Sequence, residues 1–331
     1  MPTNVAASPI GLTCLYADSL EQFIESAPEQ ILGVAAYGLP APLPPTGNYP
    51  FARVEMPVIG GDVWYEVWTA RQPVTIRQNR ELQISCAGDI LYGSLVLDEA
   101  GPGMLEATTR RAYATIFDVI DREGYPNLHR VWNYFPRINE VEQGMERYRS
   151  FSVGRYDAFM DKGREIGASG VPAACALGSK RGQLVIYFIA GKTPSLPIEN
   201  PRQTSAYFYP PEFGPRSPTF SRAMLLGSAL LISGTASIVG YKTVHSDDVL
   251  KQLDETIANL RTVLDEARTH GFSASDPAGL HLKVYLRHTD DYPAVRKIIE
   301  AEFGHAARVV YLHADVCRTD LMVEIEATWI G

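Results

Sequence analysis

The sequence has few of the residues that metal centres and disulfide frameworks need. Its four cysteines (Cys14, Cys86, Cys175 and Cys317) are far apart and include no CxxC pair. The seven histidines are scattered, without an HxxxH spacing. Zinc and iron sites are built from sets of such ligands at recurring short spacings. We therefore expect no metal ion and no disulfide framework.

Long apolar runs and basic excess are also absent. The longest apolar run, Ala223 to Ile232, is interrupted by glycine and serine and is too short to span a membrane. The first residues lack a basic segment followed by an apolar one, so no secretory signal is indicated and a cytoplasmic location is expected. The formal net charge of -8 argues against nucleic acid as a partner. Any anionic ligand must then be held by local arginines.

What the chain does have is length for two domains and an internal repeat. At 331 residues it suits two domains, each with its own core. In each half, a strand with a small-residue turn (ISCAGDILYG, 84–93; ISGTASIVGY, 232–241) precedes an amphipathic helix (106–124; 247–271). A strand (128–135; 280–286), a second helix (145–159; 292–303) and a closing strand (184–190; 321–327) follow in the same order.

This repeated alternation predicts an α+β protein. We expect two tandem domains, each a mostly antiparallel sheet with two helices on one face. The predicted boundaries are an N-terminal domain at 1–195, a linker at 196–218 and a C-terminal domain at 219–331. The linker is rich in proline and aromatic residues, which predicts an extended, stiff segment whose aromatic side chains are buried between the domains.

The closing strand of the second half, VEIEA, carries two glutamates on one face. Glu324 and Glu326 are two residues apart, so their carboxylates are roughly 6 to 7 Å apart in a strand. A solvated face of an antiparallel sheet is the simplest interpretation. The alternative is that one acid lies in a pocket and acts as a general acid. Aligning the two closing strands by sequence puts Tyr187 opposite Glu324, so the first half has no equivalent acid.

Several stretches resemble known families. The second half resembles the reactive-intermediate deaminase (Rid) family in ISGTASIVG, TIANLRTVL, LKVYLRHTDDY and VEIEATW. The arginine motif of trimeric Rid proteins is missing, because HADVCRTD occupies its place. Nearly the whole chain resembles the chorismatases, two-domain Rid relatives, in NYFPRINE (133–140), GMERYRSFSVGRYDAF (144–159), NPRQTSAYFYPPEFGPRSPTFSRA (200–223), SGTASIVG (233–240) and CRTDLMVEIEA (317–327).

The resemblance implies an activity and site residues. Chorismatases split chorismate into pyruvate and a ring product on two Rid-like, chorismate-mutase-like domains, and no cofactor is implied. Glu324, the first glutamate of VEIEA, would be the general acid, while Glu326 either orients it or faces solvent. A cysteine at position 317, seven residues before Glu324, is similar to the members that form 3-hydroxybenzoate, and Ala236 would be its small partner. The alternative is that Cys317 only fills the core. Some members also form 4-hydroxybenzoate, and the sequence does not separate these products.

Chorismate carries two carboxylates, which an arginine guanidinium binds with two parallel hydrogen bonds. Two segments supply candidate arginines: Arg137, Arg147, Arg149 and Arg155 in the first, Arg216 and Arg222 in the second. We expect Arg149, Arg155 and Arg216 above all, and Arg137 as a further candidate, although each arginine has a surface salt bridge as its alternative. Tyr207 and Tyr209 alternate along the linker, where packing and a hydrogen bond to substrate are equally compatible with the pattern.

Two other functions stay open at this stage. One is a Rid-type imine or enamine hydrolase, and the other is a non-catalytic binder of an aromatic acid. Release of pyruvate from chorismate would distinguish a chorismate-cleaving enzyme from both of these alternatives. The sequence leaves the oligomeric state open between monomer and trimer.

Overall fold

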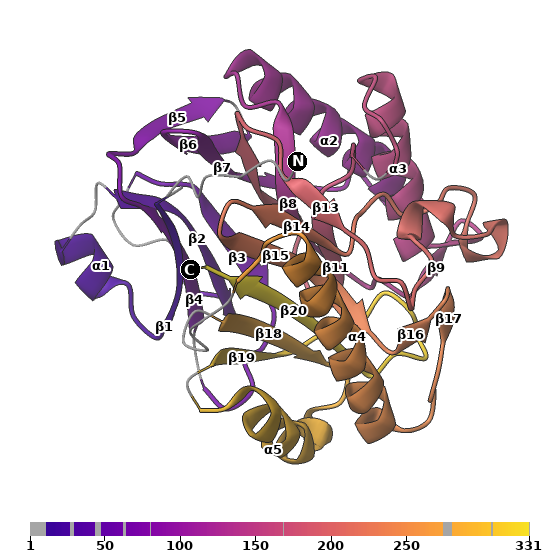
Figure 1. Ribbon diagram of the computed structural model, residues 1–331. Helices are drawn as coiled ribbons and strands as arrows, with labels where there is room; N and C mark the ends of the chain where they lie inside the picture. The colour runs from indigo at the N-terminus through magenta and orange to yellow at the C-terminus, as the bar shows by residue number, and fades with distance from the viewer. Residues whose placement is uncertain are drawn as a thin grey trace.

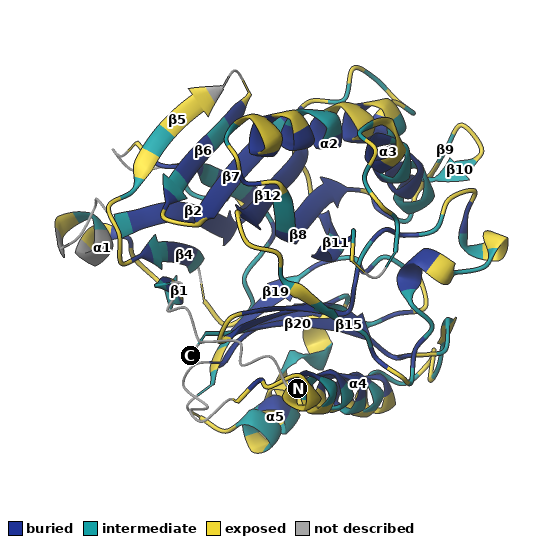
Figure 2. Ribbon diagram, turned by 45° about the horizontal axis from the view of Figure 1, so that its top comes forward, coloured by how far each residue is buried: buried dark blue, intermediate teal, exposed yellow. Residues whose placement is uncertain are grey.

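The computed structural model describes residues 11–26, 30–43, 48–61, 64–79, 81–167, 169–273, 280–305 and 307–330. Residues 1–10, on which the expectation of no secretory signal rests, lie outside these ranges. In the described part, two large sheets face each other and helices cover the outer side of each, as Figure 2 shows. A smaller sheet from the start of the chain lies beside them (Figure 1).

The first repeat forms a six-stranded sheet. Its strands are β5 (Thr75–Asn79), β6 (Leu82–Ala87), β7 (Ile90–Leu97), β8 (Asn127–Pro136), β11 (Ala173–Ser179) and β12 (Leu184–Gly191), in the order β11-β8-β12-β7-β6-β5. The helices α2 (Leu105–Arg122) and α3 (Arg147–Asp161) pack on one face, and a short hairpin, β9 (Val141–Glu142) with β10 (Met145–Glu146), precedes α3. Only β8 and β11 run parallel.

The second repeat has the same plan. Its strands are β13 (Leu196–Ile198), β14 (Ala223–Leu226), β15 (Ala229–Ala236), β18 (Leu280–Leu286), β19 (Arg308–His313) and β20 (Val323–Trp329), in the order β13-β14-β15-β20-β18-β19, with β18 and β19 parallel. The helices are α4 (Val249–Thr269) and α5 (Tyr292–Phe303), and a hairpin, β16 (Ile238–Val239) with β17 (Lys242–Thr243), precedes α4. The Asp248 carboxylate caps α4 by accepting from two backbone N–H groups of its first turn.

These two sheets confirm the predicted α+β class, with mostly antiparallel sheets and two helices on one face of each. The expected element order was incomplete, because each sheet has six strands, and among the unexpected ones β11 and β19 occupy the same place in the two repeats. Both follow the second helix and pair in parallel with the strand that precedes it. The domain boundaries stay a prediction; the expected linker contains β13 and two 3-10 helices, Ala206–Phe208 and Pro211–Phe213.

The first strands form a third sheet that the repeat did not predict. It contains β1 (Leu12–Ala17), β2 (Ile31–Gly38), β3 (Phe51–Glu55) and β4 (Trp64–Ala70) in the order β1-β4-β2-β3, with the short helix α1 (Glu21–Ser26) between β1 and β2. One hydrophobic core is shared by all three sheets, and its largest members are aromatic: Tyr37, Trp68, Trp132, Tyr134, Tyr187 and Tyr285. Each of the two repeats has a second core under its own helices.

The strand registers correct the alignment of the two halves. Val185 pairs with Tyr134 on β8, whereas Glu324 pairs with Tyr285 on β18. Each of these tyrosines is the only one in its strand, and their hydroxyl oxygens lie 2.8 Å apart. Val185 is therefore the counterpart of Glu324, and Tyr187 matches the second glutamate. The first repeat still has no acid at either position.

Candidate active site

Glu324 and Glu326 lie on the inner face of β20. Val323 and Ile325, which alternate with them, point to the other face and pack in the core under α4 and α5. Both glutamates are buried, with 4% and 3% of their surface exposed. The solvated-face interpretation is therefore wrong, because this face of the strand meets the first repeat and not water.

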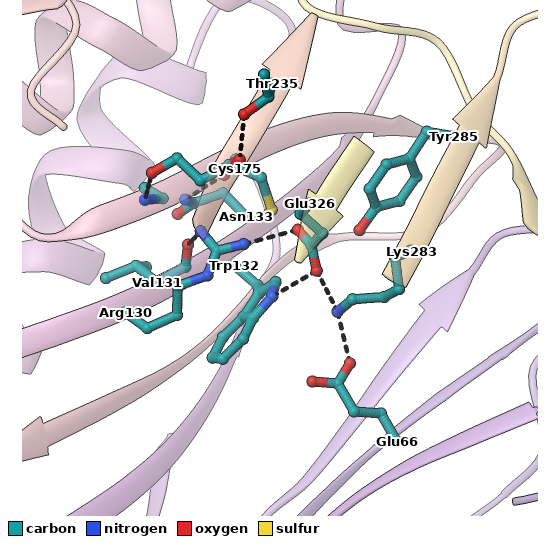
Figure 3. A network of polar contacts seen from close by, with 12 residues as sticks. Glu66, Arg130, Val131, Trp132, Asn133, Cys175, Thr235, Lys283, Tyr285 and Glu326 are labelled. Carbon is teal, nitrogen blue, oxygen red and sulfur yellow. Dashed lines mark hydrogen bonds and ion pairs between the residues drawn. The ribbon is translucent and has the colours of Figure 1, made fainter. Parts of the chain in front are cut away.

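Glu326 is surrounded by donors from two other strands (Figure 3). Lys283 Nζ lies 2.6 Å from its Oε1, and Trp132 Nε1 donates to the same oxygen at 2.8 Å. Arg130 Nη2 donates to Oε2 at 2.8 Å. Burial alone raises the pKa of Glu326, but Lys283 and Arg130 outweigh it and hold the pKa below its usual value. Glu326 is therefore ionised.

The same lysine reaches an acid of the third sheet. Lys283 Nζ lies 2.5 Å from Oε2 of Glu66 on β4, and Trp68 Nε1 donates to the other Glu66 oxygen at 2.7 Å. The four charged residues Glu66, Arg130, Lys283 and Glu326, here named the interior charge array, are all at most 3% exposed. Two acids and two bases make the array formally neutral, which offsets the cost of burying each charge.

Glu324 has a contrasting environment. None of the described residues donates a hydrogen bond to its carboxyl group. Burial raises the pKa of Glu324, the charge of Glu326 raises it further, and Arg130 and Arg222 lower it, with a net value of about 8. Glu324 is therefore largely protonated at neutral pH and available as an acid.

A break in the neighbouring strand makes room for this carboxyl group. The pairing of β15 with β20 shifts register at Ser233 and Gly234. A Cβ atom at position 234 would overlap the carboxyl group of Glu324, so only glycine allows this approach. Ser233 Oγ accepts from Ala174 N at 2.8 Å and donates to Ser221 O at 2.5 Å, which ties the break to β11 of the first repeat.

Glu324 borders a pocket of about 280 Å³ between the two repeats. A narrower extension of about 40 Å³ continues inward from it. The outer pocket is lined by Glu146, Tyr148, Arg149, Tyr209, Phe213, Pro218, Phe220, Arg222, Gly234, Ala236, Ile238, Cys317, Arg318, Thr319, Asp320 and Glu324. The extension adds Phe151, Ser152, Arg155, Ala174, Cys175, Ala176 and Thr219. The lining combines apolar side chains with four arginines and three acidic residues, and the arginines suit a small anionic ligand.

Arg155 is a buried cation without an acid partner. It extends from α3 to the inner extension and is 4% exposed. It forms no hydrogen bond or ion pair with any described residue, and its Nε and Nη2 atoms are buried without a partner. Its guanidinium group lies 5.0 Å from the ring of Tyr113. Burial lowers the pKa of Arg155. Because an unpaired buried charge is costly, this guanidinium indicates a place for an anion.

Two further arginines line the outer pocket. Arg222 is buried, and its Nη2 donates to Thr204 O at 2.8 Å and to the hydroxyl of Tyr209 at 2.9 Å. Its Nε atom has no partner among the described residues. Arg149 is more exposed, and its Nε lies 3.3 Å from Oε2 of Glu146. The structure thus brings two of the expected arginines, Arg149 and Arg155, to the pocket.

Cys317 and Ala236 also line this pocket. Cys317 borders both parts of it, next to Glu324. Burial and the nearby Glu324 raise the pKa of the Cys317 thiol to about 12, so it stays a neutral thiol at physiological pH.

Three expected residues lie elsewhere. Arg137 is half exposed and its Nη1 lies 2.5 Å from Oε1 of Glu142. Arg216 is also half exposed and its Nε lies 3.4 Å from Oδ1 of Asp157. Tyr207 is buried in the core of the first repeat. None of the three lines the pocket or its extension. Because their side chains are engaged outside the pocket, we assign them no role in substrate binding.

Sequence reasoning missed other lining residues. Tyr148, Phe220 and Arg318 were not singled out, and Arg222 was named without being favoured. No spacing pattern marks them, because they come from α3, from the segment before β14 and from the loop before β20. All four lie within the stretches that carry the family resemblance, and that signal was available.

Comparisons with known proteins agree on one family. A family model described as "Chorismatase FkbO/Hyg5-like, N-terminal" matches residues 66–190. A curated 3-hydroxybenzoate synthase from Streptomyces hygroscopicus is 34% identical over 96% of both chains. A curated chorismatase from Streptomyces rapamycinicus is 37% identical over 79% of this chain and 80% of its own. This chain belongs to the chorismatase family.

The fold of this chorismatase family member agrees with a solved structure. A crystal structure of a chorismatase superposes with a TM-score of 0.87 at 32% identity, covering 98% of this chain and 100% of that one. The family model ends at residue 190, before Glu324, whereas this superposition and the curated 3-hydroxybenzoate synthase extend over nearly the whole chain. The expected family is therefore confirmed for both repeats.

Within the described residues, no three His, Cys, Asp or Glu side chains are grouped so that they could hold a metal ion. No helix in the same part of the chain is both long enough and apolar enough to cross a membrane.

Proposed function

We propose that this protein cleaves the enolpyruvyl ether of chorismate and releases pyruvate and a hydroxybenzoate. Its curated relatives are named chorismatase and 3-hydroxybenzoate synthase. The observation that carries the proposal is the buried carboxyl group of Glu324 in the same pocket as the unpaired guanidinium of Arg155, and burial raises the pKa of Glu324 to about 8. Pyruvic acid and a hydroxybenzoic acid together contain every atom of chorismic acid, so the overall reaction is balanced without an oxidant or reductant.

Both repeats contribute to binding in this proposal. The N-terminal domain, 1–195, supplies Arg155 and Tyr148 through α3. Arg222 is supplied by the C-terminal domain, 219–331, which follows the proline-rich linker. The two arginines hold the two carboxylates of chorismate, and Phe220 with Tyr148 packs against the apolar part of the ring. Binding charged groups at both ends fixes the ether next to Glu324.

Glu324 supplies the proton that the cleavage requires. Transfer of its proton to the methylene carbon of the enolpyruvyl group creates an oxocarbenium-like centre at the ether carbon. The C4 hydroxyl oxygen then attacks C3 of the ring and displaces the ether oxygen. Pyruvate leaves with that oxygen, and an epoxide forms across C3 and C4. The hydroxyl proton returns to the Glu324 carboxylate. Opening of the epoxide with loss of a ring proton and protonation of its oxygen gives the aromatic hydroxybenzoate.

The competing outcome is hydrolysis. Water would then attack the oxocarbenium carbon, and the ring would keep both oxygens as a dihydrodiol. Cys317 borders the pocket next to Glu324, and a thiol is small and a weak hydrogen-bond donor. We propose that Cys317 favours the aromatising route and 3-hydroxybenzoate as the main product.

The test is incubation of the purified protein with chorismate. Pyruvate release is followed with lactate dehydrogenase, and the ring product is identified by chromatography against 3-hydroxybenzoate, 4-hydroxybenzoate and the dihydrodiol. Pyruvate with a hydroxybenzoate in equal amounts is expected. Binding of chorismate without pyruvate release, or hydrolysis of imines in its place, would overturn the proposal.

A further inference from the structure

The proposed cleavage uses one of the two buried glutamates of β20. Glu326 lines neither the pocket nor its extension, so it has no contact with a ligand there. It nevertheless has the more complete set of partners, with Lys283, Arg130 and Trp132 all directed at its two oxygens (Figure 3). A buried carboxylate held this firmly calls for a function beyond packing.

We propose that Glu326 is a positioning residue for the reaction, whose fixed negative charge on the inner face of β20 keeps the proton on Glu324. This inference rests on the proposed role of Glu324 as the general acid. Glu326 does not exchange a proton with the substrate. Its effect passes through the electrostatic potential at Glu324.

The charge of Glu326 is fixed because all three sheets contribute to the interior charge array. Arg130 comes from β8 of the first repeat and Lys283 from β18 of the second. Glu66 on β4 holds the far side of Lys283, which therefore lies between two carboxylates. Protonating Glu326 would leave the array with an excess positive charge at almost zero exposure. The array thus opposes neutralisation of Glu326.

The groups that face Glu324 explain why this charge matters. Arg130 and Arg222 are both cations, and each favours loss of the Glu324 proton. Cys317 and Tyr148 are also near, and burial raises the pKa of each, so both are neutral. Glu326 is the one anion among these neighbours, and it also neutralises Arg130 directly. Without its charge, Arg130 and Arg222 would lower the pKa of Glu324 with no opposing anion among these neighbours.

Glu326→Gln removes the charge with little change in shape. The amide oxygen still accepts from Arg130 or Trp132, and Lys283 keeps its pair with Glu66. The basic limb of the pH profile is the range in which kcat/KM falls as Glu324 loses its proton. We expect this limb to move to lower pH by about one unit or more, because a nearby negative charge that favours the protonated form is lost. Because the parent pKa is about 8, activity at pH 8 then falls about fivefold or more and is recovered at pH 6.

The interior charge array offers a matched control. Glu66→Gln changes the formal charge of the same array by the same amount, but at the side of Lys283 away from Glu326. We expect the basic limb of this variant to coincide with that of the parent protein. If Glu326→Gln does not fold, the charge-balanced double variant Glu326→Gln with Lys283→Met replaces it, and its limb should also lie below that of the parent.

A second readout does not depend on turnover. Infrared difference spectroscopy detects the protonated carboxyl group of Glu324 through a band that Glu324→Gln removes. Its titration midpoint should move down with Glu326→Gln and stay with Glu66→Gln. If the protein fails to cleave chorismate, this titration still tests the inference. An unshifted midpoint in Glu326→Gln, a loss of kcat equal at every pH, or the same shift in Glu66→Gln would overturn it.

Discussion

At the scale of single residues, two glutamates in one strand take opposite protonation states. Glu326 accepts from a lysine, an arginine and a tryptophan, whereas none of the described residues donates to Glu324. Burial is nearly the same for both, so partners and not depth decide the difference. An acid that is protonated at neutral pH beside an ionised one is a common arrangement in acid catalysis.

Glu324→Gln should keep the fold, because the change is isosteric, and reduce kcat on the order of 100-fold or more. In the parent protein the acid must be protonated, so kcat/KM should be constant below the pKa of about 8 and fall about tenfold per pH unit above it. Stopped assays from pH 5 to pH 10, with circular dichroism to check folding, measure both. Normal activity in Glu324→Gln would contradict the assignment.

Replacing Cys317 by Val or Ala should leave pyruvate release largely intact and shift the ring product from hydroxybenzoate toward dihydrodiol. The physical reason is that the thiol borders the pocket next to Glu324 and does not bring a water molecule to the oxocarbenium-like centre, so displacement by the C4 hydroxyl is favoured over hydrolysis. Chromatography of the ring product measures the ratio. If Cys317 is only packing, truncation to Ala lowers stability by about 1 kcal/mol or more and the ratio stays unchanged.

Arg155→Met should raise KM for chorismate about 10- to 100-fold, because charge-assisted hydrogen bonds to a carboxylate are lost. It should also raise the Tm of the ligand-free protein, since it removes a buried cation that has no partner among the described residues. Arg216→Met is the matched control and should leave KM unchanged, because Arg216 lies outside the pocket. Equal effects of the two changes would exclude Arg155 as a carboxylate-binding residue.

At the scale of elements, the site depends on how β15 is interrupted. The register shift at Ser233 and Gly234 opens the space that the Glu324 carboxyl group occupies. The same residues link β15 to the edge strand β11 through Ser233 Oγ. The SG pair of this strand therefore has two local tasks, positioning the acid and joining the repeats.

Gly234→Ala should reduce kcat by about 100-fold or more, because the added methyl group displaces the Glu324 carboxyl group from its place. Gly101→Ala is the matched control, since a methyl group there meets no atom within 4 Å and kcat should not change. Assays of kcat with Tm for both variants measure the difference. Full activity in Gly234→Ala would show that the acid does not need this approach.

At the scale of the whole molecule, the pocket exists because two repeats pack against each other. The first repeat supplies Arg155 and Tyr148, and the second supplies Glu324, Arg222 and the linker side chains. The third sheet takes no part in lining the pocket, yet Glu66 completes the interior charge array. The third sheet thus holds one end of the array, although it does not pair with β20.

Activity should survive exhaustive treatment with EDTA, and added nicotinamide, flavin or pterin should not increase it. The proposed cleavage needs a proton, two carboxylate-binding groups and no change of oxidation state in a cofactor. The measurement is pyruvate release from chorismate before and after dialysis against the chelator. Loss of activity that a divalent metal restores would count against the mechanism.

The sequence by itself determined the repeat, the α+β class, the family and the identity of the candidate acid. Helix and strand periodicities are local, and the motif stretches are long, so a single chain is enough to read them. The third sheet, formed by β1 to β4, was not predicted, because the residues before the repeat carry no matching pattern. β11 and β19 escaped because neither alternates between buried and exposed residues, so neither carries the period of two that marks a half-buried strand.

Only the tertiary structure decided which side chains meet. Arg137, Arg155 and Arg216 are alike in sequence, but one is buried without a partner and two form surface ion pairs. The ionised state of Glu326 follows from Lys283 on β18 and from Arg130 on β8, which is 196 residues away in the chain, and the charge of Glu326 acts in turn on Glu324. Electrostatic coupling depends on distance through space and on burial, and neither is encoded in the spacing of residues along one strand.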